Sequence, residues 1–135
     1  MKHRILVVED NPLNSELLRD WLEVEGYEVL LATDLNAAFA AVRTQQPNAV
    51  LLDIQLGSDD GLELVRWMRD QLVDCPIPVI AVTAQAMAAD RKRILESGCH
   101  GFVSKPVDFK ILQEQLQLCL SQAAALQENQ VPGKK

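Results

Sequence analysis

The stretch R-I-L-V-V-E-D-N-P, residues 4–12, decides the fold. Its apolar run, residues 5–8, ends at the acidic pair Glu9 and Asp10. A short apolar run rich in β-branched residues indicates a strand buried on both faces. Asn11 is a favoured N-cap, and the proline after it suits the first position of a helix. The stretch therefore predicts a buried strand that carries two carboxylates into the turn before a helix.

The same alternation continues along the chain. Further strands are predicted at residues 27–31, 49–52, 79–82 and 101–103. Helices are predicted from the cap Asn11 to Gly26, from the cap Asp34 to before Pro47, from about Asp60 to Leu72, over 85–97 with Gly98 as the stop, and from about Asp108 to Leu120. This alternation predicts an α/β fold, a doubly wound parallel sheet of five strands flanked by five helices.

Composition limits the class of protein. A chain of 135 residues with 48% hydrophobic residues fits one domain with a sizeable core. The net charge of −6 argues against direct nucleic-acid binding. No apolar run approaches the roughly 18 residues of a membrane span, and no signal peptide is present, so a cytoplasmic protein with no membrane partner is expected. Cys75, Cys99 and Cys119 are scattered and predict buried or idle thiols.

Helical periodicity fades after Leu120, where Gln, Pro, Gly and Lys accumulate. Residues 1–121 are therefore predicted to form the domain, and 122–135 a frayed helix and disordered tail. The start at Met1, just before the first strand, favours a stand-alone protein, and a piece of a larger one is the alternative that stays open.

Polar residues follow the predicted strands. Glu9 and Asp10 follow the first, Asp53 the third, Thr83 the fourth, and Lys105 with Pro106 the fifth. Ligands of doubly wound sheets bind at the carboxyl ends of the strands. Three carboxylates, one hydroxyl and one ammonium group are therefore expected to meet at one edge.

Clustered carboxylates repel each other by roughly 1 kcal/mol per pair at about 4 Å in water, and by about 4 at an effective dielectric near 20. Lys105 supplies one compensating charge, and Mg²⁺ is the natural second partner because it prefers carboxylate oxygens. With the charge of incoming phosphoryl oxygens neutralised, a free carboxylate can attack phosphorus. The arrangement favours an acyl phosphate on aspartate.

Four motifs carry a family resemblance: V-V-E-D-N-P at 7–12, L-L-D-I-Q-L at 51–56, A-V-T-A at 81–84 and F-V-S-K-P at 102–106. Over roughly residues 3 to 120 the chain resembles a CheY-like receiver domain of a response regulator. The residues of these motifs most resemble those of stand-alone DivK-like receivers and of the receiver modules of hybrid histidine kinases. The resemblance implies the flavodoxin-like strand order 2-1-3-4-5.

The resemblance also implies a function. Asp53 would accept a phosphoryl group from a histidine kinase or a histidine phosphotransfer protein in a two-component or phosphorelay pathway. Mg²⁺ (or Mn²⁺) would be held by Asp10, Asp53 and the backbone carbonyl of Gln55, with Glu9 acting directly or through water.

A switch is implied as well. Thr83 would hydrogen-bond the phosphoryl group, Lys105 would pair with it, and the Lys105 to Pro106 peptide would be cis. Phe102 matches the aromatic residue that swings inward on activation. The fourth helix, fifth strand and fifth helix would present this change to an unknown downstream protein or a weakly bound second copy.

The loop after Asp53 departs from the family pattern, because Gly57 stands where proline is usual and Asp59 and Asp60 follow. Glycine is expected to loosen this loop, and the two acids to affect metal affinity or partner choice.

Two other functions compete with this hypothesis. In an enzyme with Asp53 as nucleophile, a second acid usually follows two residues later. Gln55 stands at that position and cannot donate a proton as an acid would. Only slow self-dephosphorylation is therefore expected, and the protein is not expected to be an enzyme. The second alternative is an interaction domain that works without phosphorylation. The presence of the complete set argues against it, because such a domain would need none of these residues: Glu9, Asp10, Asp53, Thr83 and Lys105.

Overall fold

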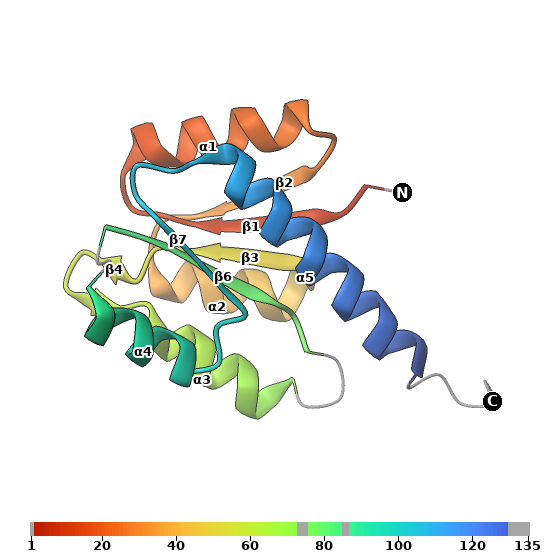
Figure 1. Cartoon of the computed structure of the whole chain (residues 1–135). Helices are drawn as coiled ribbons and strands as arrows, with labels where there is room; N and C mark the ends of the chain where they lie inside the picture. Colours follow the sequence, from red (N-terminus) through yellow and green to blue (C-terminus); the bar gives the residue numbers. More distant parts are fainter. Residues whose placement is uncertain (1, 73–75, 85–86, 130–135) are drawn as a thin grey trace.

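Five parallel strands form the central sheet of the computed structural model, which describes residues 2–72, 76–84 and 87–129, with 123–129 as backbone only. The strand order is β2-β1-β3-β6-β7, the fold expected from the sequence (Figure 1). The sheet consists of β1 (Arg4–Val8), β2 (Glu28–Ala32), β3 (Ala49–Leu52), β6 (Val79–Thr83) and β7 (Gly101–Ser104). The helices are α1 (Pro12–Val24), α2 (Leu35–Gln45), α3 (Leu62–Gln71), α4 (Ala88–Glu96) and α5 (Phe109–Asn129).

Local signals set the helix ends. The Asn11 side chain accepts hydrogen bonds from the N–H groups at the start of α1, and Asp34 does the same for α2. Gly26 has a φ of 92° just after α1, and Gly98 has a φ of 114° just after α4. Both glycines adopt the left-handed backbone that ends a helix without steric cost.

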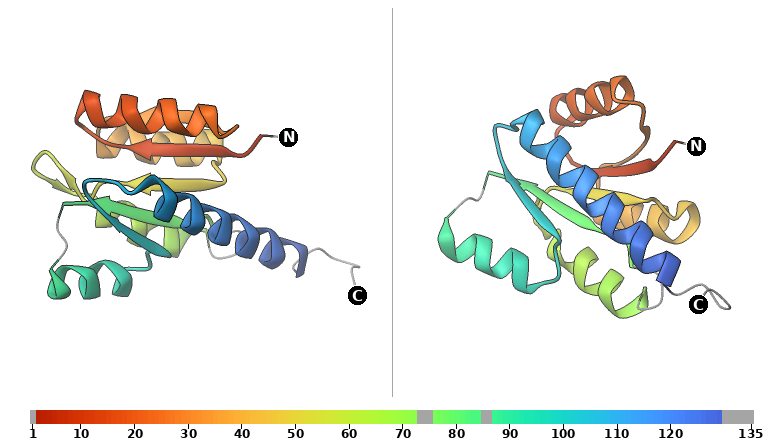
Figure 2. Two further views of the ribbon diagram at one scale, coloured as in Figure 1. Left: turned by 45° about the horizontal axis from the view of Figure 1, so that its top comes forward. Right: turned by 45° about the vertical axis from the view of Figure 1, so that its right-hand side comes forward.

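Each face of the sheet has its own hydrophobic core. Helices α1 and α5 pack on one face, where Leu22 and Leu116 are fully buried. Helices α2, α3 and α4 pack on the other face, where Leu64 and Ile94 are fully buried. Figure 2 shows the sheet between these two layers of helices. Because both faces are covered, the middle of each sheet strand is apolar, and polar residues appear only at its first or last position or beyond it.

Some element bounds differ from the sequence prediction. Helix α3 begins at Leu62, because Asp59–Asp60 forms β5 and pairs with β4 (Gln55–Leu56). Helix α4 begins at Ala88, and residues 85–86 lie outside the described part of the chain. Helix α5 runs to Asn129, into the segment 122–135 that the sequence predicts to begin as a frayed helix. The end of the predicted tail, 130–135, is outside the described residues.

Two further sequence expectations concern cysteines and membranes. Cys99 and Cys119 are free and buried, while Cys75 falls outside the described residues. None of the described helices combines the length and apolar character needed to cross a membrane.

Candidate functional site

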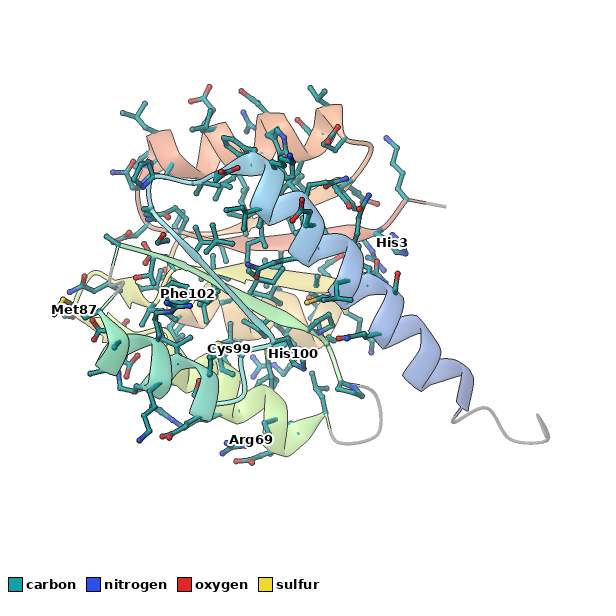
Figure 3. The ribbon with its side chains drawn as sticks, in the orientation of Figure 1. His3, Arg69, Met87, Cys99, His100 and Phe102 are labelled. Atoms are coloured by element: carbon teal, nitrogen blue, oxygen red, sulfur yellow. The ribbon has the colours of Figure 1, made fainter. Side chains whose placement is uncertain are left out.

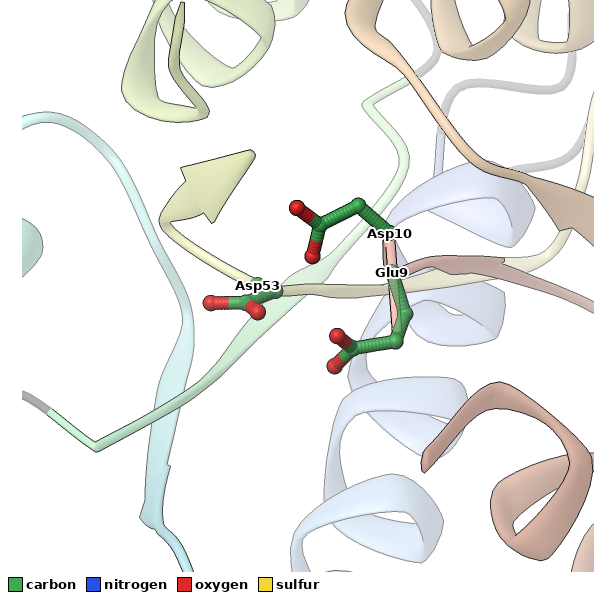
Figure 4. A group of neighbouring side chains, drawn as sticks. All are labelled: Glu9, Asp10 and Asp53. Carbon is green, nitrogen blue, oxygen red and sulfur yellow. The ribbon is translucent and has the colours of Figure 1, made fainter. Parts of the chain in front are cut away.

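The carboxyl ends of β1 and β3 bring three acids together. Glu9 and Asp10 directly follow β1, Asp53 directly follows β3, and the two strands are paired neighbours. One carboxylate oxygen from each residue lies within 4.8 Å of the other two. Glu9 and Asp53 are buried and Asp10 is exposed, so the cluster reaches solvent at Asp10. Figure 4 shows the three carboxylates close to one another.

Lys105 joins the two buried carboxylates from the end of β7. Its Nζ donates to Glu9 Oε2 at 2.8 Å and to Asp53 Oδ2 at 3.1 Å. Its backbone N–H donates to the carbonyl of Thr83 at 2.9 Å, which ties the loop to the end of β6. The following peptide bond, Lys105–Pro106, is cis, as the resemblance implies.

Backbone N–H groups complete the contacts of the acids. The N–H of Asn11 donates to Glu9 Oε1 at 3.1 Å, and that of Gln55 donates to Asp53 Oδ1 at 3.1 Å. The N–H of Gly57 donates to Asp10 Oδ2 at 2.9 Å. Each carboxylate therefore accepts one main-chain hydrogen bond, which fixes its orientation while leaving oxygen lone pairs free.

The charges of the cluster do not balance. Burial raises the pKa of Glu9, the hydrogen bond from Lys105 opposes this, and the neighbouring Asp53 raises it further. Burial alone would lower the pKa of Lys105, but its hydrogen bonds to Glu9 and Asp53, together with the charge of these two carboxylates, outweigh burial and the pKa is raised. Lys105 is therefore a fixed cation facing three acids. Hard oxygen ligands with excess negative charge are what Mg²⁺ prefers, so these residues fit a divalent metal.

Thr83 lies at the end of β6, the strand beside β3, and Phe102 lies near the start of the edge strand β7. Thr83 ends β6 and is 1% exposed. Phe102, in the edge strand β7, is half-buried beside α4, and the guanidinium of Arg91 lies 5.5 Å from its ring centre (Figure 3). The Gln115 side chain from α5 bonds both the N–H and the carbonyl of Phe102, at 2.9 and 2.8 Å. The α4 and α5 helices thus both contact this aromatic residue.

The loop after Asp53 forms a short hairpin of β4 and β5. That Gly57 loosens this loop stays a prediction. Gly57 has a φ of 61° at the turn between β4 and β5. Asp60 forms ion pairs with Arg93 at 3.3 Å and with Arg66 at 3.6 Å, and also accepts from the N–H of Leu62. The Asp60 carboxylate is therefore paired with arginines and does not join the acidic cluster. Among the described residues, that cluster consists of Glu9, Asp10 and Asp53.

Sequence reasoning missed Gly61. A Cβ at this position would lie 2.6 Å from the carbonyl oxygen of Asp53 and 3.0 Å from that of Ile54. The Gly61 N–H also donates to the Ile54 carbonyl at 2.6 Å. A glycine a few residues after the central acid was the available signal, but its meaning depends on a backbone contact that only the fold creates.

Comparisons with known proteins agree with this geometry. The response regulator receiver domain family model matches residues 5–117. The polar-differentiation response regulator DivK of Brucella anthropi is 42% identical over 107 residues, which cover 79% of this chain and 87% of that protein.

Solved structures show the same fold. The receiver domain of a sensor histidine kinase from Pseudomonas aeruginosa is 34% identical, with a TM-score of 0.81 over 90% of this chain and 99% of that one, and holds a coordinated magnesium ion in its active-site cleft. The BeF3-activated receiver domain of RstA from Klebsiella pneumoniae is 27% identical, with a TM-score of 0.79 over 87% and 97% of the two chains. The family model spans most of the chain, so this protein belongs to the response regulator receiver domain family.

Proposed function

We propose that Asp53 is the phosphoacceptor of a two-component or phosphorelay pathway in the cytoplasm, and that it receives its phosphoryl group from a histidine kinase or a histidine phosphotransfer protein. The observation that carries this proposal is the placement of Asp53. Its carboxylate lies between a lysine ammonium at 3.1 Å and two further acids within 4.8 Å. A nucleophilic carboxylate thus has a cation and metal ligands beside it.

The metal site is assigned to Glu9, Asp10, Asp53 and the backbone carbonyl of Gln55, with Mg²⁺ or Mn²⁺ as the ion. When bound, the ion neutralises the phosphoryl oxygens. An Asp53 oxygen attacks phosphorus, the bond from phosphorus to the histidine nitrogen breaks, and its electron pair returns to the imidazole. Lys105 then pairs with a phosphoryl oxygen, and Thr83 donates its hydroxyl to another.

The surface beside Asp53 suits a helical partner that carries a phosphohistidine. On α1, the apolar side chains of Leu13 and Leu17 are 76% and 57% exposed. A cavity of about 180 Å³ adjoins Leu17 and is also lined by Lys105, Pro106 and Phe109. An apolar strip that reaches a residue of the reaction site can bury a partner's helix and align its histidine in the same contact.

Transmission to a downstream protein is assigned to the face formed by α4, β7 and α5. Phosphorylation adds nearly two negative charges and three acceptor oxygens at Asp53. Engagement of Thr83 frees space for Phe102 to move inward from its contact with Arg91. An unknown target, or a second copy in a weak homodimer, binds the changed face.

Sustained phosphatase turnover is not part of this proposal. The side chain two residues after Asp53 belongs to Gln55, which cannot act as a general acid. Hydrolysis of the acyl phosphate therefore proceeds slowly, as self-dephosphorylation.

The test is mass spectrometry of the intact protein after incubation with acetyl phosphate and Mg²⁺, or with a phosphorylated histidine phosphotransfer protein. A single labile phosphoryl group is expected, absent in Asp53→Ala and absent when EDTA replaces Mg²⁺. The matched control is Asp59→Asn, which alters an exposed acid of the neighbouring hairpin. Labelling that survives Asp53→Ala, or no labelling by either donor, would refute the assignment.

A further inference from the structure

The hairpin after Asp53 donates to two of the three clustered acids. The N–H of Gln55 in β4 reaches Asp53 Oδ1 at 3.1 Å, and the N–H of Gly57 at the turn reaches Asp10 Oδ2 at 2.9 Å. Asp10 is exposed, and the structure gives its carboxylate no side-chain ion pair among the described residues. Gly57 is therefore its one described hydrogen-bond donor.

This contact depends on the residue at position 57. Proline, which the family pattern places there, has no N–H and holds φ near −65°. Gly57 has an N–H and a φ of 61°, a left-handed conformation open to glycine and tolerated by asparagine. The substitution therefore both creates the donor and permits the turn that aims it at Asp10.

The hairpin is held firmly enough to aim that donor. Leu56 is 4% exposed and packs in the hydrophobic core on the face of the sheet that α2, α3 and α4 cover. Gln55 pairs with Asp60 and Leu56 with Asp59 across the hairpin, and Asp60 is fixed by ion pairs to α3 and α4. A turn anchored at both of its strands presents its N–H at a defined place.

We infer that the Gly57 N–H is a positioning group for the metal site, which holds the Asp10 carboxylate in the orientation that binds a divalent cation. This inference rests on the proposed metal-dependent function and deepens it. With one lone pair of Oδ2 engaged by Gly57, Oδ1 is the oxygen that keeps both of its lone pairs for a metal. Ligating carboxylates are commonly hydrogen-bonded in this manner, and loss of such a contact typically weakens metal binding by about 10- to 100-fold.

The test measures Mn²⁺ binding to the full chain by the electron paramagnetic resonance signal of free Mn²⁺, with Mg²⁺ as competitor. Gly57→Pro removes the donor and is expected to raise the dissociation constant about tenfold. Gly57→Asn is the matched control, because it keeps the N–H, tolerates the left-handed backbone, and its Cβ would meet no atom within 4 Å. Its dissociation constant is expected to stay within about twofold of the wild-type value.

A second variant separates the hydrogen bond from the shape of the turn. Semisynthesis with glycolic acid at position 57 replaces the N–H by an ester oxygen and leaves φ free. This variant is expected to weaken Mn²⁺ binding like Gly57→Pro, even if the proline variant fails to fold. Wild-type affinity in the ester variant, or a loss in Gly57→Asn as large as in Gly57→Pro, would overturn the inference and leave the proposed function standing. Absence of Mn²⁺ binding by the wild-type protein would instead refute the metal-dependent function itself.

Discussion

Replacement of Asp10 by asparagine should stabilise the metal-free protein, although it removes one of the proposed metal ligands. Asp10 lies with Glu9 and Asp53 in a cluster whose oxygens are within 4.8 Å of one another. Because Asp10 is exposed, a water-like dielectric applies, and each like-charge pair costs about 0.9 kcal/mol at this separation. Removing one charge therefore relieves about 1.7 kcal/mol of repulsion.

Part of that gain is lost at Gly57. Its N–H donates to the Asp10 carboxylate, and a hydrogen bond to a neutral amide oxygen is weaker than one to a carboxylate by about 1 kcal/mol. The expected net gain is about 0.5 to 1 kcal/mol, which raises the urea midpoint by about 0.3 to 0.5 M for a domain of this size.

Metal should reverse the order of stabilities. At ten times its dissociation constant, Mg²⁺ adds about 1.4 kcal/mol to the wild-type protein and nothing to Asp10→Asn. Urea unfolding followed by circular dichroism, in EDTA and in Mg²⁺, measures both effects. Asp59→Asn, which changes an exposed acid outside the cluster, should shift neither midpoint by much. An Asp10→Asn protein that is less stable than wild type in EDTA would show that repulsion does not dominate the cluster.

Three more predictions concern the site and its surroundings. The pKa of Glu9 is raised above 4.5, so the folded protein binds a proton at this residue more readily than the unfolded chain does. The free energy of unfolding of the metal-free wild-type protein should therefore rise relative to that of Glu9→Gln as the pH falls from neutrality through the raised pKa toward 4.5. A difference between the two proteins that stays constant with pH would contradict this. Gln115→Leu removes two hydrogen bonds to the main chain of Phe102 and should speed hydrogen exchange of the Phe102 amide about tenfold. An unchanged exchange rate would show that Gln115 does not hold the Phe102 main chain in place. Gly61→Ala should cost about 1 to 3 kcal/mol in thermal unfolding and slow phosphorylation, since the added methyl group meets the Asp53 carbonyl; wild-type values would refute it.

Much of this molecule could be predicted from its sequence because the informative signals are local. Each strand of the central sheet contains a short apolar run, and each of the first two helices begins at a side chain that caps it. The meeting of Glu9, Asp10, Asp53 and Lys105 follows from one rule, that parallel strands end at the same edge of a sheet. No knowledge of contacts is needed for that step. The hairpin at residues 55–60 was missed because two-residue strands have no periodicity to detect.

The hydrogen bonds that orient the acids could not be predicted from the sequence. Their donors are main-chain N–H groups at Asn11, Gln55 and Gly57, and every residue except proline has such a group. A sequence therefore cannot reveal which of them points at a carboxylate. It can reveal only where a donor is impossible, and position 57 is such a place in the family pattern, since proline is usual there. The sequence pattern predicts that this glycine loosens the loop, and in the fold its N–H also donates to Asp10, a hydrogen bond that a proline at position 57 would forbid.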